Sequence, residues 1–177
     1  MAARPLVVGV ADLRRQPGTR RRLRRAVALT GLGISSAHVP EGAELLLDLE
    51  LEALSNGLTA TGTVTVPWVG ECRRCLRDVA GESVAEVREV FEPSPVEGET
   101  YRLGEDTVDL EPMVRDATLL ALPLAPLCGQ DCRGPAPHAF PAGVEGEPDE
   151  SDDAGEEPAP DPRWAALGEL RFDSPGD

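Results

Sequence analysis

Residues 44–66 read ELLLDLELEALSNGLTATGTVTV, and this stretch decides the fold. In its first half, Leu or Ala occupies every second position from 45 to 53, with acidic residues at most positions between them. In its second half, threonines alternate with small apolar residues from 58 to 66. A period of two predicts strands with one buried face, and Asn56-Gly57 favours the left-handed geometry of a tight turn. The stretch is therefore predicted to form an antiparallel hairpin.

Weaker signals on both sides extend this sheet. Residues 83–91 alternate less regularly and are predicted to form a third antiparallel strand, and residues 6–10 are predicted to form a short strand of their own. Pro17-Gly18 interrupts the segment 12–25 and argues against one continuous helix there. Residues 31–42 are predicted to be a loop.

A helix is predicted over Asp109–Leu122. Asp109 is a good N-cap, and Pro123 ends the helix. The apolar residues of this segment fall on one face at helical spacing: Leu110, Met113, Val114, Ala117, Leu120 and Ala121. The expected fold class is α+β, an antiparallel β-meander with a packed C-terminal helix.

The expected domain covers residues 4–133. The chain that follows is rich in acids, Pro and Gly up to residue 161 and has few large apolar residues, a composition typical of disorder. Residues 134–177 are therefore predicted to be a disordered, acidic, flexible tail. Within this tail, Trp164, Leu167 and Leu170 are spaced for one or two turns of a docking helix at 161–170.

The composition limits both the core and the compartment. Hydrophobic residues make up 41% of the 177 residues but aromatic residues only 3%, so the core must be built from Leu, Val and Ala. No apolar run approaches the ~20 residues that span a bilayer, and the N-terminus lacks the apolar region of a secretory signal. We therefore expect a cytoplasmic protein with no membrane partner, whose cysteines are reduced.

Four cysteines in two close pairs are the first candidate site. Cys72 and Cys75 have the spacing C-x2-C, and Cys128 and Cys132 have the spacing C-x3-C. Four thiolates suit tetrahedral zinc, so one zinc ion held by all four is expected. Two alternatives stay open, namely unligated thiols and a C-x-x-C redox pair. The redox alternative is the weaker one because this C-x-x-C follows a predicted strand instead of opening a helix.

Arginines near the N-terminus are the second candidate site. The formal net charge is −15, yet residues 1–40 contain eight Arg and only one Asp. Guanidinium groups match phosphate oxygens, so one interpretation is a basic arm that contacts RNA. The other is a solvated loop paired with the protein's own acids. The predicted RNA-binding residues are Arg14, Arg15, Arg20, Arg21, Arg22, Arg24 and Arg25.

The sequence does not support an enzyme. It shows no Ser/His/Asp arrangement, no phosphate-binding Gly loop and no H-E-x-x-H motif. Of the two histidines, His38 lies in a predicted loop, and His138 is at most a reserve zinc ligand. We therefore expect no catalytic residues and no small-molecule substrate.

Several stretches together resemble the YceD family of large ribosomal RNA subunit accumulation proteins. The similarity lies in the hairpin with Thr61-Gly62-Thr63 and in the motifs VPEG, GECRRCL, DLEPMVRD, ALPLAPLC and DPRWAAL, which begin at residues 39, 70, 109, 121 and 161. Their order and spacing are more specific than a single C-x-x-C. The resemblance implies a cytoplasmic, non-enzymatic role in the accumulation or processing of large-subunit ribosomal RNA.

The chain departs from the family pattern after its second cysteine pair. Many similar proteins have G-L-C-x-x-C-G there, whereas residues 134–140 read GPAPHAF, with Ala136 and Ala139 in place of the two cysteines. A metal site built from those later cysteines would be damaged in this chain. A site built from the four cysteines present would be intact.

Two functions follow from these observations. The first is a ribosome-assembly factor whose partner is ribosomal RNA or a large-subunit ribosomal protein. The second is a zinc-binding adaptor that contacts only protein. Salt-dependent RNA binding distinguishes them, because phosphate contacts release counterions.

Overall fold

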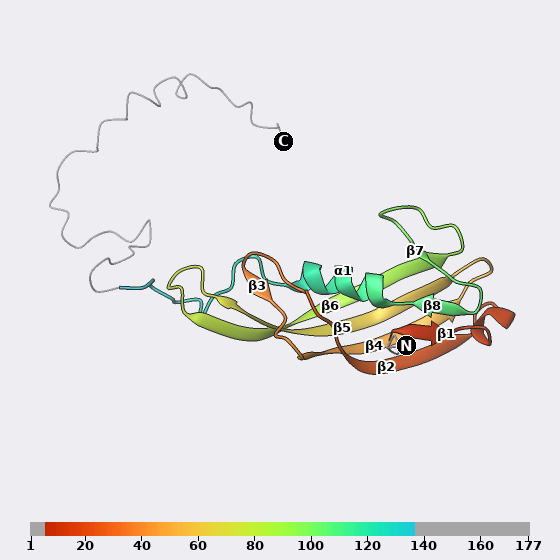
Figure 1. Cartoon of the computed structure of the whole chain (residues 1–177), viewed down its shortest axis with the longest axis horizontal. Coiled ribbons are helices and arrows are strands. Elements are labelled where there is room, and N and C mark those ends of the chain that lie inside the picture. Colours follow the sequence, from red (N-terminus) through yellow and green to blue (C-terminus); the bar gives the residue numbers. More distant parts are fainter. Residues whose placement is uncertain (1–5, 137–177) are drawn as a thin grey trace, which may run out of the picture. The chain divides into compact units, whose positions relative to one another are not determined.

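The computed structural model describes residues 6–136, which form one main β-sheet with a helix packed across it (Figure 1). In this sheet the strand order is β2-β4-β5-β6-β7, and β3 pairs with β5 beside that path. A second, two-stranded sheet joins β1 to β8. The elements are β1 (Val7–Gly9), the 3-10 helix η1 (Leu13–Arg15), β2 (Arg20–Ala28), β3 (Ala37–His38), β4 (Glu44–Ala53), β5 (Leu58–Glu71), β6 (Asp78–Glu92), β7 (Tyr101–Arg102), β8 (Thr107–Asp109) and α1 (Glu111–Ala121).

The predicted hairpin is confirmed as β4 and β5. The two strands are antiparallel, with Leu51 opposite Ala60 and Ala53 opposite Leu58. The leucines at 45, 47, 49 and 51 are all buried, whereas Leu46, the exception to the alternation, is 52% exposed. Successive side chains of a strand point to opposite faces, so the period of two in this stretch correctly indicated which face is buried.

The turn of this hairpin differs from the expected one. Leu54 donates its N–H to the Gly57 carbonyl at 3.0 Å, which centres the turn on Ser55-Asn56, and Asn56 and Gly57 do not have positive φ. Gly57 has another role, because a Cβ at this position would lie 2.7 Å from the Phe91 carbonyl oxygen. The glycine is therefore required by the close approach of β6 and not by the turn.

The third strand is also confirmed, and it is longer than expected. β5 and β6 pair from Leu58–Phe91 to Glu71–Asp78, so the hairpin continues well beyond residue 66. Trp68 lies opposite Gly81, and a Cβ at Gly81 would lie 2.6 Å from the Trp68 ring. The indole thus occupies the space that a side chain at position 81 would need. This part of the hairpin leads directly to the first cysteine pair.

The arginine-rich segment is part of the sheet, not the separate arm or loop that the sequence suggested. After η1, the chain turns at Gly18, whose φ is 84°, and enters β2, which runs antiparallel to β4. Among the residues of β2, only Val27 is fully buried. An edge strand with so few buried positions shows little hydrophobic alternation, which explains why the sequence did not reveal it.

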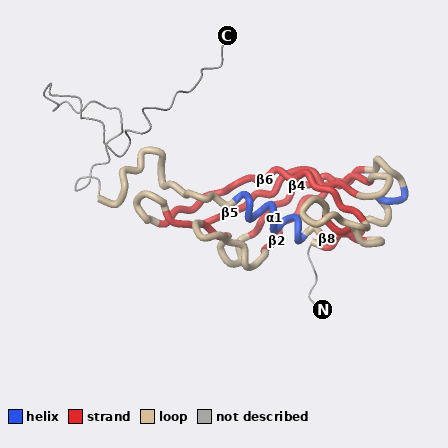
Figure 2. Tube along the Cα trace, turned by 90° about the horizontal axis from the view of Figure 1, so that it is seen from above, coloured by secondary structure: helices blue, strands red, loops and turns tan. Residues whose placement is uncertain are grey.

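The predicted helix is confirmed as α1, which lies over the strands when seen from above (Figure 2). Its N-cap is Leu110 and not Asp109, because Asp109 is the last residue of β8. The Asp109 carboxylate accepts a hydrogen bond from the Glu111 N–H at 3.0 Å, and Met113 and Val114 are buried. Leu120, assigned to the buried face, is instead 87% exposed. Leu120 lies seven residues after Met113, and seven residues of an α-helix turn through about 20° less than two full turns. The Leu120 side chain is therefore displaced around the helix from that of Met113, beyond the edge of the packed face.

The core is built from aliphatic residues, as the composition indicated. Leu, Val and Ala side chains of β4, β5, β8 and α1 fill it, with Phe91 the one fully buried aromatic ring among the described residues. No helix in the range 6–136 is long and apolar enough to cross a membrane. The expected flexible tail and its docking segment at 161–170 lie almost wholly outside the described residues and stay predictions.

Candidate functional site: a cysteine cluster and an arginine-rich strand

The two cysteine pairs come together at one end of the β5–β6 hairpin. Cys72 and Cys75 occupy the turn between the strands, where the Leu76 N–H donates to the Cys72 carbonyl at 2.8 Å. After α1, the chain runs back along the sheet to this turn (Figure 1), and the Arg73 N–H donates to the Pro126 carbonyl at 2.9 Å. These backbone contacts bring residues more than 50 positions apart into one cluster.

The four sulfurs have the spacing of a tetrahedral metal site. All four Sγ atoms lie within 4.8 Å of one another. Cys72 and Cys132 are 3.8 Å apart, and Cys75 and Cys128 are 3.7 Å apart. Zn–S bonds of about 2.3 Å in a tetrahedron place the sulfurs about 3.8 Å apart. None of the four cysteines forms a disulfide, so all four sulfurs are available as ligands of one metal ion.

Two arginines surround this cluster. The Arg77 guanidinium donates to the Cys75 sulfur at 3.3 Å and to the Cys128 sulfur at 3.5 Å. Arg74 donates to the carbonyls of Gln130 and Cys132, both at 3.0 Å. Arg77 therefore supplies positive charge to the sulfurs themselves, while Arg74 holds the second cysteine loop in place. Sequence analysis missed Arg77, whose position two residues after Cys75 was the available signal.

The cysteines differ in their tendency to ionise. The backbone N–H of Cys75, followed by that of Cys128, lowers the pKa of Cys72 to about 6. The Arg77 side chain lowers the pKa of Cys75, whereas the Cys132 sulfur raises the pKa of Cys128 to about 12. Cys72 therefore ionises more readily than Cys128. Metal binding requires thiolates and releases the remaining protons.

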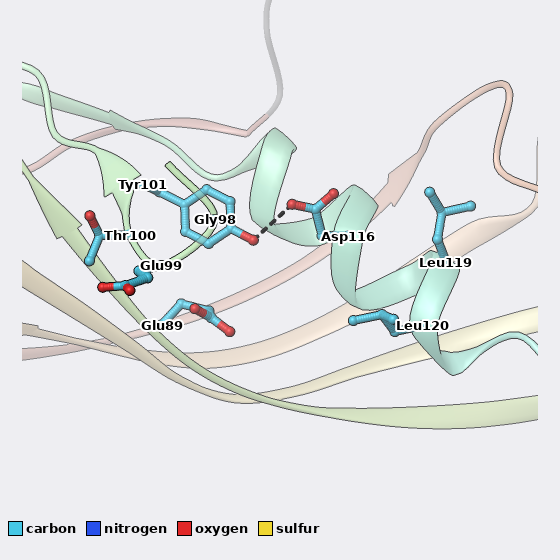
Figure 3. Close-up of a pocket in the computed structure, with 8 residues that line it drawn as sticks. All are labelled: Glu89, Gly98, Glu99, Thr100, Tyr101, Asp116, Leu119 and Leu120. Atoms are coloured by element: carbon cyan, nitrogen blue, oxygen red, sulfur yellow. Dashed lines mark hydrogen bonds between the residues drawn. The ribbon is translucent and has the colours of Figure 1, made fainter. Parts of the chain in front are cut away.

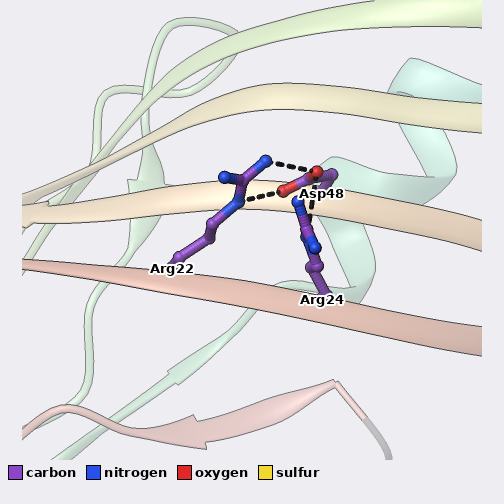
Figure 4. Close-up of polar contacts among 3 residues, drawn as sticks. All are labelled: Arg22, Arg24 and Asp48. Atoms are coloured by element: carbon purple, nitrogen blue, oxygen red, sulfur yellow. Dashed lines mark hydrogen bonds and ion pairs between the residues drawn. The ribbon is translucent and has the colours of Figure 1, made fainter.

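Three arginines of β2 are paired with acids of the neighbouring strand. Arg22 donates two hydrogen bonds to Asp48, at 2.7 and 2.6 Å, and Arg24 donates to the same carboxylate at 3.1 Å (Figure 4). Arg20 contacts Glu50 at 3.4 Å and Glu52 at 3.1 Å. The Arg22 hydrogen bond lowers the pKa of Asp48. These contacts match the alternative in which the arginines pair with the protein's own acids.

The other predicted RNA-binding residues lie around this strand. Arg21 contacts Asp12 at 3.3 Å and the Gly9 carbonyl at 2.5 Å, and Arg14 donates to the carbonyls of Gly104 and Glu105. Side chains of a strand alternate between its faces, so the arginines at 20, 22 and 24 lie on one face and those at 21 and 25 on the other. Arg15 is exposed in η1. RNA binding by these seven residues stays a prediction.

A hollow between α1 and β6 was also missed. Its volume is about 520 Å³, and it is lined by Glu89, Glu99, Tyr101, Asp116 and Leu120, among others (Figure 3). The Tyr101 hydroxyl donates to the Asp116 carboxylate at 2.8 Å. Burial, followed by this hydrogen bond, raises the pKa of Tyr101. The sequence carried no signal for it, since its residues come from separate elements.

The architecture and the cluster define a small α+β protein with a candidate four-cysteine metal centre. A family model described as large ribosomal RNA subunit accumulation protein YceD matches residues 60–171. The chain belongs to this family, as the sequence motifs indicated. The matched range contains all four cysteines of the cluster.

The chain is also similar to curated proteins of mycobacteria. An uncharacterized protein of Mycobacterium tuberculosis (strain ATCC 25618 / H37Rv) is 36% identical over 176 residues, which covers 95% of this chain and 82% of the relative. An uncharacterized protein of Mycobacterium bovis has the same identity and coverage. One from Mycobacterium leprae is 35% identical over 138 residues, covering 73% of this chain and 64% of the relative. No solved structure matches.

Proposed function

We propose that this protein is a non-enzymatic, cytoplasmic factor that promotes accumulation or processing of large-subunit ribosomal RNA. The observation that carries the proposal is membership of the YceD family over residues 60–171. The factor acts by binding ribosomal RNA or a large-subunit ribosomal protein, and not by catalysis. A centre with four protein thiolates supports this, because such a site leaves no open metal position for a substrate.

The cysteine cluster is proposed to hold one structural zinc ion. Cys72, Cys75, Cys128 and Cys132 would be its ligands, and the ion would join the β5–β6 turn to the segment that follows α1. Metal analysis of protein purified without chelator should find about one zinc per chain. The variant Cys75→Ser should lose the ion and melt at a lower temperature. Metal-free wild type whose melting is unaffected by a chelator would contradict the assignment.

Loss of the protein in its own cells provides the functional test. The expected result is a fall in mature large-subunit ribosomal RNA relative to small-subunit ribosomal RNA, restored by the wild-type gene. Unfinished large-subunit particles should also accumulate in sucrose gradients. An unchanged ratio, with normal particles, would refute the proposal. A cell that expresses the Cys75→Ser variant then shows whether the metal centre is needed for the role.

A second function is favoured by the ion pairs of β2. Because Asp48, Glu50 and Glu52 pair with three of the arginines, the basic strand is already partly neutralised. This supports a zinc-binding adaptor that contacts protein and not RNA. Binding of ribosomal RNA by purified protein that weakens steeply with salt would favour the first function. Absence of RNA binding, combined with a ribosomal-protein partner, would favour the second.

A further inference from the structure

β6 has a free edge along most of its length. It pairs with β5 on one side from Asp78 to Phe91, but on the other side only Phe91 and Glu92 pair with β7. Within the described part of the chain, no strand covers the outer edge of residues 78–90. Such an edge offers a row of backbone donors and acceptors, to which an extended segment can add as a further strand.

A groove runs beside this edge, between β6 and α1. It consists of two adjoining hollows of about 280 and 520 Å³, which share Glu89, Tyr101, Asp116 and Leu120. Val84 of β6 and Leu120 of α1 border it and are 62% and 87% exposed. Exposed apolar side chains along an open strand edge are expected where another chain docks.

The charge of the groove defines what fits it. Glu86, Glu89 and Glu99 line the groove, and no arginine lines it in the described chain. Within residues 6–136 none of these three glutamates has an ion-pair partner. Asp116 accepts only the neutral Tyr101 hydroxyl, so its charge is also uncompensated (Figure 3). The carboxylates of β4, in contrast, face arginines of the same molecule.

We propose that this edge binds an extended, basic segment of a protein partner, which adds as a strand to β6. Glu89 lies on the face of β6 that α1 covers, whereas Val84 and Glu86 lie on the other face. The Arg or Lys side chains of the segment would therefore lie on the α1 face, against Glu89, Glu99 and Asp116, and its apolar side chains on the other face, beside Val84. RNA is excluded from this surface, because phosphates would meet uncompensated carboxylates. This edge would be the surface that contacts a large-subunit ribosomal protein in the proposed function, on which the proposal rests. The binding test below measures strand addition to β6 alone and does not depend on that function.

A second copy of the chain is a poorer occupant. Two β6 edges paired antiparallel would bring Glu82, Glu86 and Glu89 of one copy beside those of the other, with Arg88 as the single β6 cation to offset them, and like charges across strands are destabilising. The basic edge strand β2 of another copy is a poor match, because three of its arginines are already paired with Asp48, Glu50 and Glu52. Charge complementarity therefore favours a foreign segment.

The test uses the full chain and a labelled peptide of about thirteen residues in which Arg alternates with Val, long enough to cover the free edge. Fluorescence anisotropy should show binding, and hydrogen exchange should show new protection of amides within residues 78–90. A peptide with Glu in place of Arg should not bind. Protection confined to other residues, or equal binding of both peptides, would overturn the proposal.

Two further comparisons separate strand addition from simple charge attraction. The double variant Glu89→Gln/Glu99→Gln should weaken binding about fivefold or more, whereas the control Glu41→Gln/Glu44→Gln removes the same charge away from the groove and should have no effect. Two further peptides are N-methylated at alternate residues, one at the odd positions and one at the even positions, and both keep their charge. In an added strand every second backbone N–H faces β6, so one of these two peptides should lose binding. Retained binding of both methylated peptides, or a protein that dimerises through residues 78–90 and rejects the basic peptide, would refute strand addition.

Discussion

Arg77 shows how one residue outside a ligand set can matter to it. A zinc ion with four thiolates carries two net negative charges, and the Arg77 guanidinium lies 3.3 and 3.5 Å from two of the sulfurs. Groups that contact metal ligands typically change metal affinity 10–100-fold when they are removed. In the proposed zinc centre, Arg77 would therefore offset charge and fix the orientation of Cys75 and Cys128.

We expect Arg77→Gln to lower zinc affinity by about tenfold. Competition with a coloured chelator measures this directly. The matched control is Arg73→Gln, because Arg73 lies in the same turn but, within residues 6–136, bonds only through its backbone N–H, to the Pro126 carbonyl. Equal zinc affinity of the two variants would show that the guanidinium at the sulfurs has no such role.

Asp48 leads to a prediction about pH. Its pKa is lowered, first by the hydrogen bond from Arg22, so the folded chain binds this proton more weakly than the unfolded chain. The contribution of Asp48 to stability is therefore complete above its unfolded pKa of about 3.9 and is lost as the pH falls through its lower, folded value. The variant Asp48→Asn lacks this contribution at every pH.

Thermal unfolding at several pH values tests this directly. Wild type should melt at a higher temperature than Asp48→Asn near neutral pH, and the difference should shrink below about pH 4. The control Glu44→Gln changes an exposed acid of the same strand and should follow the wild-type curve. If the melting temperatures of wild type and Asp48→Asn differ by the same amount at all pH values, the pairing of ionised Asp48 with Arg22 contributes nothing to stability.

At the scale of the elements, α1 gives a matched pair of substitutions. Val114 is completely buried and Leu120 is 87% exposed, although both belong to the apolar set of the same helix. Val114→Asp should cost on the order of 3 kcal/mol of unfolding free energy, because it buries an unpaired charge. Leu120→Asp should stay within about 0.5 kcal/mol of wild type. Denaturant titration of both variants measures the two values, and similar costs would show that the buried face is wrongly placed.

The elements also show where sequence reasoning succeeds. β4, β5 and β6 were predictable because each buries alternate side chains, and the helix because its apolar spacing is close to 3.6 residues. β2 was not predictable, because its place is decided by pairing with β4 and by ion pairs to Asp48, Glu50 and Glu52. Long-range pairing of an edge strand leaves little trace in its own residues.

The candidate site was predictable to a similar degree. The spacing of the four cysteines was enough to predict that they would meet, and the sulfurs do converge. The contact of Arg77 with them was not predictable, since it depends on where the turn directs the side chain. The groove beside β6 was missed for a related reason, because it joins residues from β6, β7 and α1 that share no motif.

For the whole molecule, the central question is how a protein of net charge −15 can approach RNA. The basic strand β2 is the densest positive segment, but its arginines at 20, 22 and 24 are held by carboxylates of β4. RNA contact would therefore require phosphates to replace those carboxylates. Each such contact adds roughly 0.7–0.9 to the slope of log affinity against log salt.

We expect Arg20→Gln/Arg22→Gln/Arg24→Gln to weaken binding of ribosomal RNA and to reduce this salt slope by roughly 2. The opposite change is the sharper control. Asp48→Asn/Glu50→Gln/Glu52→Gln releases the same arginines without removing them, so it should strengthen RNA binding and steepen the slope. Titrations at two salt concentrations, with melting curves for each variant, make the comparison. If both triple variants bind RNA as wild type does, β2 is not the contact, and if wild type binds none, the protein-only adaptor is favoured.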